Sequence, residues 1–411
     1  MLNNRFIIIF LAILYILHDM PILGYRYPSI LYAFIVISLF LLLSYDVGAK
    51  TLQKIIPIFL IPLLDVFISS VDAYYFFQGI SRFLQFLILP LLAIHIYNWN
   101  DIKMAKLLLL IYLGINFITC FTTYNGCMVY PEASRELAAG DASSAPFYYL
   151  YMDANIGGFH FIYSTVLISG LIIYTIKNFR YIKGGYILLP LCIVYLGLIF
   201  MTLLAAEYTL SVLMFVSYVF LLFVRGAFSI KNFFLLSVFI ILSFLMLKPL
   251  ISNGLKSLSE ATESEHVASR LYDLHLKLEG NHTQKHSDYD SRKETYIKSI
   301  EQFEKKLLGC WNLNGMGGHS FVLDSMAKYG LLGLILVVIS NICIYRYFLS
   351  PYENDYIFGY VFYIFILYIV ASVLNPIIFT NIIMFVFPLY KLIFQENSCD
   401  YNEFIENDLY K

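Results

Sequence analysis

Long apolar runs recur along the whole chain and limit most strongly what it can fold into. About 20 apolar residues are enough for a helix to cross the hydrocarbon core of a bilayer. The runs lie at residues 6–17, 30–45, 55–70, 74–97, 107–122, 159–176, 186–204, 208–224, 232–248, 321–345, 356–374 and 377–394. The sequence therefore predicts an all-α polytopic membrane protein with about 12 transmembrane helices.

The composition excludes a soluble domain. Hydrophobic residues make up 60% of the chain and charged residues only 13%, and the mean hydropathy is +0.74. Soluble domains contain about 45–50% apolar and about 25% charged residues, and one water-soluble core cannot hide a surplus of this size. The lipid bilayer is the expected partner. The net charge of −1 and the lack of a basic tract give no sign of nucleic-acid binding.

Positive charges alternate between the loops that join these runs. Lysines and arginines concentrate in every second loop, at Lys50, Lys54, Lys103, Lys106, Lys177, Arg180, Lys183, Arg225, Lys231 and Arg346. Loops rich in these residues stay on the cytoplasmic side of a membrane. We therefore expect a multi-pass protein of the plasma membrane with both termini in the cytoplasm.

Two loops are then expected to face outward. The first nine spans occupy residues 1–248, with an outer loop at 123–158; a larger outer loop at 249–320 precedes the last three spans at 321–395 and a cytoplasmic tail at 396–411. In the large loop, apolar spacing predicts a helix near 267–278. A second helix is expected to begin at Ser291, in a capping box with Glu294, and to end at Gly309. Both are amphipathic, so they should lie on the bundle or on the membrane surface.

Arginines in and near the outer loops are candidate ligands for an anionic group. Arg292 falls in the first turn of the second predicted loop helix, where free backbone N–H groups favour phosphate. Arg270 flanks the apolar face of the first loop helix, and Arg135 lies in the smaller loop. Arg82 lies inside a span and needs an anionic ligand or a carboxylate such as Asp65. The simpler alternatives are a solvated charge for Arg292 and a snorkelling side chain for Arg270.

A glycine-rich segment, GMGGHS at 315–320, leads into the tenth run. Glycines before a helix let the backbone approach a ligand, and histidine is the side chain best suited to accept a proton near neutral pH. His319 is thus a candidate general base, with an interfacial histidine as the alternative. Asp324 and Lys328 should face a polar cavity or each other, because a charge inside a span costs about 2.5–3.5 kcal/mol.

No cofactor or metal is expected. The six cysteines show no metal-ligand spacing. Two histidines and two aspartates lie close together in the large loop, but nothing supplies a convincing third ligand; they are His282, His286, Asp288 and Asp290. The sequence also contains no phosphate-binding glycine loop, no nucleophile elbow and no zinc helix.

The stretch from Ser269 to Gly333 resembles the Wzy family of bacterial O-antigen and capsule polymerases, which are relatives of the O-antigen ligases. The resemblance covers about a sixth of the chain. The resembling pieces are SRL at 269–271, SR at 291–292 with Tyr296, Ser299 and Phe303, LG at 308–309, GGHS at 317–320, LD at 323–324 and KYGLLG at 328–333.

The resemblance implies a membrane glycosyltransferase that uses undecaprenyl-pyrophosphate-linked glycans at the outer face of the bacterial inner membrane. The growing chain leaves its lipid pyrophosphate and joins a sugar hydroxyl of an incoming lipid-linked unit. By analogy, Arg292 and Arg270 would hold the pyrophosphate, with Arg82 as a second clamp. His319 would accept the hydroxyl proton. Asp324 and Arg135 complete the candidate substrate-binding residues, and a chain-length regulator and a flippase are the protein partners.

Two other functions stay open on the sequence alone. An O-antigen ligase would transfer finished polymer to lipid A-core, and it shares the outline of a loop arginine, then a histidine, then a Gly-x-x-Gly helix. A flippase or transporter for lipid-linked sugars commonly has two repeated halves, and the sequence shows no such symmetry. The chain also departs from the arginine-to-glycine spacing that some polymerases show in their outer loops, both from Arg292 to Gly309 and from Arg135 to Gly140.

Overall fold

The computed structural model of the chain is helical. It describes residues 2–18, 20, 23, 29–69, 73–130, 153–182, 184–206, 208–222, 249, 252–261, 268, 271–272, 275–276, 279, 288–312, 316–350, 358–376 and 382–395. No strand occurs among these residues. The helices are α1 (Leu2–Leu17), α3 (Ser29–Val47), α4 (Ala49–Ile55), η1 (Ile56–Phe59), α5 (Leu60–Ser69), α6 (Ala73–Asn98), α7 (Ile102–Val129), α10 (Phe159–Lys177), η3 (Phe179–Tyr181), α11 (Gly185–Ala205), α12 (Thr209–Phe220), α15 (Asp288–Lys305), α16 (Phe321–Tyr329), α17 (Leu331–Ile344), η4 (Tyr345–Leu349), α18 (Phe358–Leu374), η6 (Ile382–Val386) and α19 (Phe387–Gln395).

Six of the described helical segments are long and apolar enough to cross a membrane. They are Ile30–Val47, Ala49–Ile68, Ile102–Val129, Phe159–Lys177, Gly185–Ala205 and Leu331–Leu349. Five shorter apolar helices accompany them, at Arg5–Leu17, Phe83–Asn98, Leu210–Phe220, Phe358–Leu374 and Ile382–Ile393. The expectation of an all-α polytopic membrane protein is thereby confirmed. A helix suits hydrocarbon because it satisfies its own backbone groups.

Buried polar side chains form hydrogen bonds between the apolar helices. The Asn116 amide of α7 donates to Thr165 Oγ1 of α10 at 2.9 Å, and the Tyr195 hydroxyl of α11 donates to Asn116 Oδ1 at 2.5 Å. Thr202 of α11 donates to the Cys120 carbonyl of α7 at 3.0 Å. These residues are buried, so the contacts fix the mutual positions of three helices in surroundings with little water to compete.

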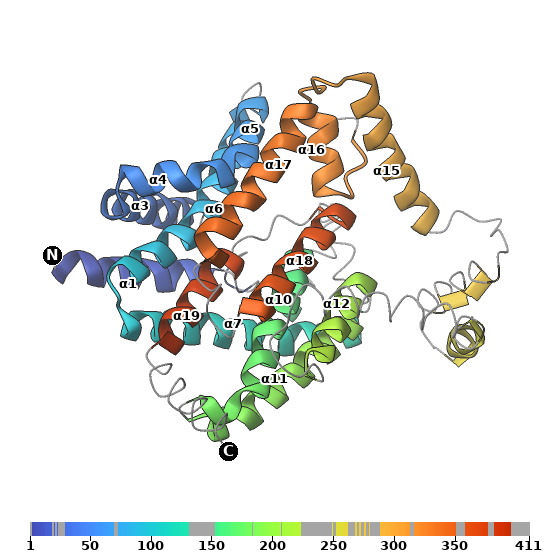
Figure 1. Cartoon of the computed structure of the whole chain (residues 1–411), viewed down its shortest axis with the longest axis horizontal. Helices are drawn as coiled ribbons and strands as arrows, with labels where there is room; N and C mark the ends of the chain where they lie inside the picture. The colour runs from blue at the N-terminus through green and yellow to red at the C-terminus, as the bar shows by residue number, and fades with distance from the viewer. Residues whose placement is uncertain are drawn as a thin grey trace, which may run out of the picture.

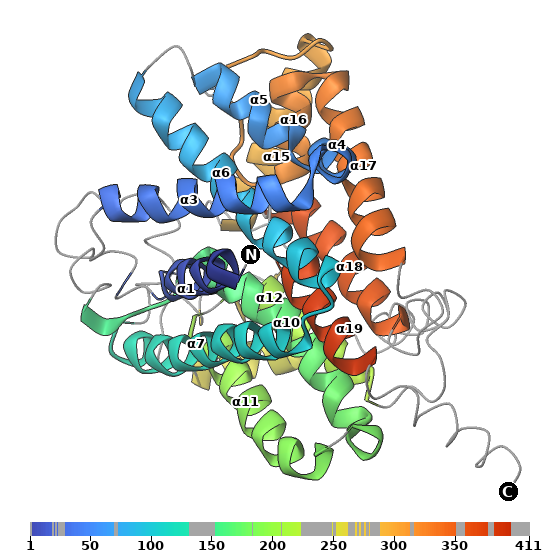
Figure 2. The same ribbon diagram turned by 90° about the vertical axis from the view of Figure 1, so that its left-hand side faces the viewer.

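The helices are not all parallel. Figure 2 shows α3 and α7 running crosswise to α17, while α5, α15, α16 and α17 gather at one end of the molecule in both views (Figures 1 and 2). This end carries α15 and the described residues 306–312 and 316–320 of the large loop. It also carries the contacts of α15 with α16 and of α16 with α17.

The predicted span at 321–345 is wrong as a single helix, because the chain reverses at Gly330. Gly330 has φ +65° and ψ −144°, which separates α16 from α17. A Cβ on Gly333 of α17 would overlap the backbone of Ser325 in α16, at 2.8 Å from its carbonyl carbon. Residues eight positions apart meet like this only if the chain folds back on itself. The two helices are therefore a closely packed hairpin.

The second loop helix also differs from its prediction. The helix α15 begins at Asp288, so Ser291 lies inside it and the predicted capping box does not mark its start. Arg292 is therefore the fifth residue of the helix rather than a member of its first turn. The run at 232–248, most of 123–158 and the tail at 396–411 lie outside the described residues.

Candidate functional site

The candidate site lies where α15, the glycine-rich segment and α16 meet. Ser299 of α15 is 1% exposed and donates its hydroxyl to Asp324 Oδ1 of α16 at 2.6 Å. The same Ser299 oxygen accepts the backbone N–H of Gly317 at 3.0 Å. One buried hydroxyl of α15 thus contacts both the glycine-rich segment, 18 residues further along the chain, and α16, 25 residues further along.

Asp324 collects further donors from the glycine-rich segment. The backbone N–H of Gly318 donates to Asp324 Oδ1 at 3.3 Å, and that of Ser320 donates to Asp324 Oδ2 at 3.2 Å. Ser320 also caps α16, because its hydroxyl accepts the Leu323 N–H at 3.1 Å. Both carboxylate oxygens are therefore engaged, and their contacts hold the segment in one shape against the start of α16.

The backbone geometry of this segment requires glycine at two positions. A Cβ on Gly317 would overlap the Thr295 backbone, at 2.6 Å from its carbonyl carbon, so only glycine lets the segment cross α15 this closely. Gly318 has φ +77°, a conformation that other residues rarely adopt. His319 follows at once, with an exposed side chain. The segment thus presents a histidine to the exterior from a backbone held on both sides.

The end of α18 borders the same site. The Tyr296 hydroxyl of α15 donates to the Leu374 carbonyl at 2.6 Å. The first N–H of α16, from Phe321, donates to the Asn375 carbonyl at 3.2 Å. Asn375 is buried, and within the described chain its side-chain nitrogen has no hydrogen-bond partner. The site is therefore anchored to a helix whose apolar character places it in the membrane region.

Asp324 and Lys328 do not pair with each other, which was one of the two alternatives for them. Lys328 instead pairs with Asp65 of α5, and the Tyr329 hydroxyl donates to the same Asp65 oxygen at 2.5 Å. Asp324 is half-buried and is satisfied by the neutral donors of Ser299 and the glycine-rich segment. Asp65, the carboxylate suggested for Arg82, is thus bound by two residues of α16.

At this end of the molecule the backbone at Gly309 crosses close to the backbone at Gly330. Gly309 has φ +87°, and a Cβ on it would meet the Tyr329 backbone at 2.6–2.7 Å. A Cβ on Gly330 would meet the Gly309 nitrogen at 2.5 Å. The Leu331 N–H donates to the Leu307 carbonyl at 2.9 Å, which ties the turn after α15 to the α16–α17 hairpin.

The structure locates the predicted arginines only in part. Arg292 lies on α15, seven residues before Ser299, which is about two helical turns. Arg82 lies on α6. The side chains of both, and all of Arg270 and Arg135, lie outside the described residues. Of the predicted site residues, the structure therefore brings His319 and Asp324 together.

Several residues that form hydrogen bonds in the site were not among the predicted site residues. Ser299 and Tyr296 stood in the resembling stretch only as pattern positions, although their three-residue spacing puts them on one face of a helix. No local signal in the sequence links Asn375 to α16. Among the described residues, no group of three or more histidine, cysteine or carboxylate side chains could hold a metal ion.

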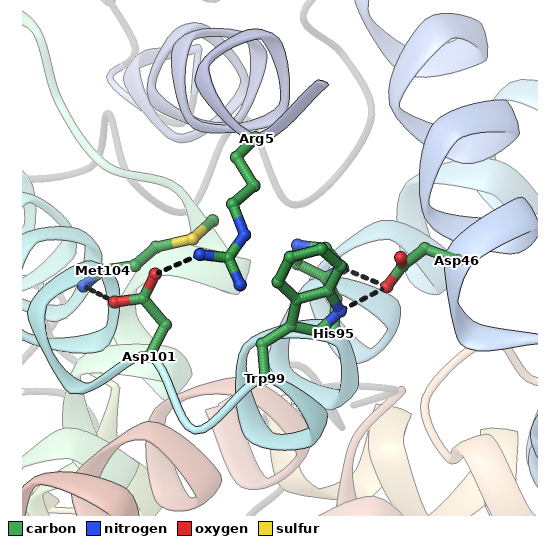
Figure 3. Close-up of polar contacts among 6 residues, drawn as sticks. All are labelled: Arg5, Asp46, His95, Trp99, Asp101 and Met104. Carbon is green, nitrogen blue, oxygen red and sulfur yellow. Dashed lines mark hydrogen bonds and ion pairs between the residues drawn. The ribbon is translucent and has the colours of Figure 1, made fainter. Parts of the chain in front are cut away.

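A second polar cluster lies among α1, α3, α6 and α7 (Figure 3). The Nδ1 atom of His95 lies 2.6 Å from Asp46 Oδ2, and the Trp99 indole N–H donates to the same oxygen at 2.9 Å. The Arg5 guanidinium lies over the Trp99 ring, 3.7 Å from its centroid, and 4.0 Å from Asp101 Oδ2. Asp101 caps α7 by accepting the Met104 N–H at 3.0 Å, an N-cap contact that its sequence position allows. These contacts connect four helices.

Two comparisons with known proteins found no match. No protein-family model matches the chain, and no curated protein matches it. The function is therefore inferred from the site and from the sequence resemblance.

Proposed function

We propose that the chain is a polysaccharide polymerase of the Wzy type that works at the outer face of the bacterial inner membrane. The observation that carries the proposal is that separate pieces of the resembling stretch are neighbours in space. Ser299, Gly317 and Asp324 are joined by hydrogen bonds, and Gly309 crosses Gly330 backbone to backbone. If the matching residues resembled the family only by chance, they would not be expected to lie next to one another in space.

The proposed reaction is a glycosyl transfer between two lipid-linked substrates. The bond between the anomeric carbon of the growing chain and its pyrophosphate oxygen breaks, and undecaprenyl pyrophosphate leaves with the electron pair. The hydroxyl oxygen of the incoming repeat unit forms the new bond to that carbon and gives its proton to His319. Exposure of His319 supports this assignment, because a general base needs access to the substrate.

Arginines supply the charge that the leaving group requires. Arg292 lies on the helix that also carries Ser299, so it is on the same side of the molecule as His319. An arginine can bind pyrophosphate oxygens with two parallel hydrogen bonds and stabilise the charge that develops as they leave. Arg270, Arg82 and Arg135 are the further clamps in this proposal.

Asp324 has a positioning role in the proposal rather than the substrate contact expected from sequence. Its oxygens accept hydrogen bonds from Ser299, Gly318 and Ser320. These bonds fix the backbone on both sides of His319. A base must be held close to the proton that it removes, and an error of about 1 Å costs on the order of 100-fold in rate.

The proposal includes the membrane arrangement inferred from the loop charges. It has about 12 spans, both termini in the cytoplasm and the large loop outside. The apolar segment Leu331–Leu349 fits this arrangement, because it begins beside the site and its last turn carries Arg346, one of the positive charges expected on the cytoplasmic side. Lipid-linked donors then reach the site from the outer leaflet.

The test is the surface polysaccharide of a deletion strain, separated on a gel with and without the restored gene. A polymerase predicts lipid A-core that carries one repeat unit in the deletion strain and a ladder after restoration. Restoration with Arg292→Ala should leave single repeats, whereas the matched neighbour Lys293→Ala should restore the ladder. Long chains retained on the lipid carrier beside bare core would instead indicate a ligase. A full ladder from stably inserted Arg292→Ala protein would refute the central assignment.

A further inference from the structure

The turn between α15 and the α16–α17 hairpin exposes a group of large apolar side chains. Leu308 is 81% exposed, Leu307 52%, Trp311 47% and Leu331 46%. We call these four residues the apolar tip. Burying one such side chain stabilises a protein by about 1.5–3 kcal/mol relative to leaving it in water. Four exposed neighbours therefore indicate a surface that another apolar phase covers.

The apolar tip cannot bury itself by folding back. The Trp311 N–H donates to the Lys328 carbonyl at 3.0 Å, and the Leu331 N–H donates to the Leu307 carbonyl at 2.9 Å. The Trp311 indole N–H donates to the Leu308 carbonyl at 2.8 Å, so the polar group of the ring is satisfied within the turn. Since Gly309 also packs against the Tyr329 backbone, the turn is fixed. The Trp311 ring contacts the Tyr329 ring edge-on at 5.5 Å between centroids, and about half of Trp311 and most of Leu308 stay exposed.

The tip is continuous with a surface that faces lipid. Leu331 is the first residue of the membrane-spanning candidate Leu331–Leu349. Ile335, Val338 and Ile342 follow it at helical spacing on one face, and each is at least half exposed. A second candidate span, Ala49–Ile68, ends beside the tip, because its Asp65 pairs with Lys328. The tip therefore lies at a level where two spans reach the edge of the hydrocarbon.

Charges next to the tip fit the polar side of that boundary. Lys305 and Lys306 immediately precede Leu307, and both are exposed. The Lys305 ammonium lies 3.3 Å from Glu301 Oε2, an exposed pair of the kind that contributes little and that a lipid phosphate can replace. Lysine side chains beside a lipid surface can extend their ammonium groups to phosphates, and tryptophan is enriched at the interface between headgroups and acyl chains.

We propose that the apolar tip inserts into the headgroup–acyl boundary of the leaflet at which the Leu331–Leu349 span begins, with Lys305 and Lys306 at the phosphate level. The occupant of this surface is thus the bilayer itself. This inference stands without the proposed function. If that function is correct, the tip also fixes the height of the His319 segment over the leaflet that delivers the lipid-linked donor.

The two tryptophans of the chain allow a direct test. The full chain is reconstituted in vesicles of phosphatidylcholine and phosphatidylglycerol, and the signal of Trp311 is the difference between the unaltered protein and Trp311→Phe, which retains only Trp99. Lipids brominated near the headgroup end of the acyl chain should quench the Trp311 signal strongly. Lipids brominated near the chain middle should quench it less, and aqueous iodide should barely quench it.

A second variant checks the insertion independently. Leu308→Asp should lift the turn from the boundary and make Trp311 accessible to iodide, whereas the matched change Leu308→Met should leave quenching unchanged. Strong iodide quenching of Trp311 in the unaltered protein would place the tip in water and overturn the proposal. Protection from both iodide and brominated lipid would show that protein, such as a second copy of the chain, covers the tip, and would also overturn it.

Discussion

Two aspartates organise two polar clusters of the molecule in opposite ways. Asp46 of α3 accepts hydrogen bonds from the side chains of His95 in α6 and of Trp99, the residue that follows α6. Asp324 accepts from the Ser299 hydroxyl and from backbone N–H groups of the segment that carries His319. The Asp46 cluster joins helix to helix, whereas the Asp324 cluster shapes a loop that presents an exposed histidine.

This difference indicates that the Asp46 cluster stabilises the helix packing, whereas the Asp324 cluster positions His319. The partners of Asp46 are closed in, with His95 only 2% exposed and Arg5 stacked over Trp99. The segment held by Asp324 carries the exposed side chain of His319. Changes at the first cluster should therefore lower the amount of folded protein, and changes at the second should lower the activity of each folded molecule.

The largest effect should come from His319→Ala. Loss of a general base typically costs about 10²- to 10⁴-fold in rate, so the polysaccharide ladder should collapse to single repeats. Protein level in the membrane should be unchanged, because the His319 side chain is exposed and its truncation opens no cavity in the core. His160→Ala is the matched control, since His160 is also an exposed histidine at the start of a span that is expected to begin on the outer side. Normal ladders from His319→Ala would remove the histidine from the mechanism.

Asp324→Ala should reduce polymer formation by about 100-fold through misplacement of the His319 segment. The change also leaves the N–H groups of Gly318 and Ser320 without their acceptor, at about 1–3 kcal/mol for each group that stays buried. In vitro polymerisation per mole of folded protein measures the first effect, and a thermal melt in detergent measures the second. Glu304→Ala, an exposed carboxylate on α15, is the control. Full activity per folded molecule would show that the segment does not need Asp324.

Asp46→Asn, in the other cluster, should lower stability and leave the activity of each folded molecule unchanged. A hydrogen bond to a charged group contributes about 1.5–3 kcal/mol, so the melting temperature and the yield in the membrane should both fall. Activity per folded molecule should stay close to that of the unaltered protein. Tyr45→Phe is the matched control, because Tyr45 is 91% exposed beside Asp46. A selective loss of activity at normal stability would break the proposed division between the clusters.

The smallest effect should come from Arg5→Ala. Its contact with Asp101 is long and partly exposed, and exposed ion pairs contribute about 0–1 kcal/mol. Its stacking on Trp99 contributes about 0.5–1 kcal/mol. The melting temperature should therefore fall less than for Asp46→Asn, and Arg5→Lys should keep part of the difference. A larger loss than at Asp46 would show that Arg5 rather than Asp46 is the centre of this cluster.

The apolar pattern predicted most of the described helices because hydrocarbon leaves the backbone few alternatives. It missed the reversal at Gly330, because the run at 321–345 is apolar on both sides of the turn and hydropathy carries no information about φ. The start of α15 was also missed. Ser291 and Glu294 fit a capping box, but the chain is already helical from Asp288.

The polar pairing could be predicted only where the partners are close in sequence. Asp324 and Lys328 are one helical turn apart, which made them the obvious ion pair. In the structure, Lys328 binds Asp65, which is 263 residues away. Spacing rules describe neighbours on one helix and cannot choose between distant spans. The contact between Ser299 and Asp324 escaped prediction for the same reason, since it joins two helices across the glycine-rich segment.

The bond between Asp65 and Lys328 also sets an order of events during biosynthesis. Ribosomes add about 5–20 residues per second, so a gap of 263 residues corresponds to roughly 15–50 s of synthesis. During that interval the Ala49–Ile68 segment has left the ribosome, while the lysine that neutralises its carboxylate does not yet exist. Three residues before the end of that segment, Asp65 can stay hydrated at the membrane edge. The Ala49–Ile68 segment therefore lacks this ion pair until the α16–α17 hairpin has been synthesised and packs beside it.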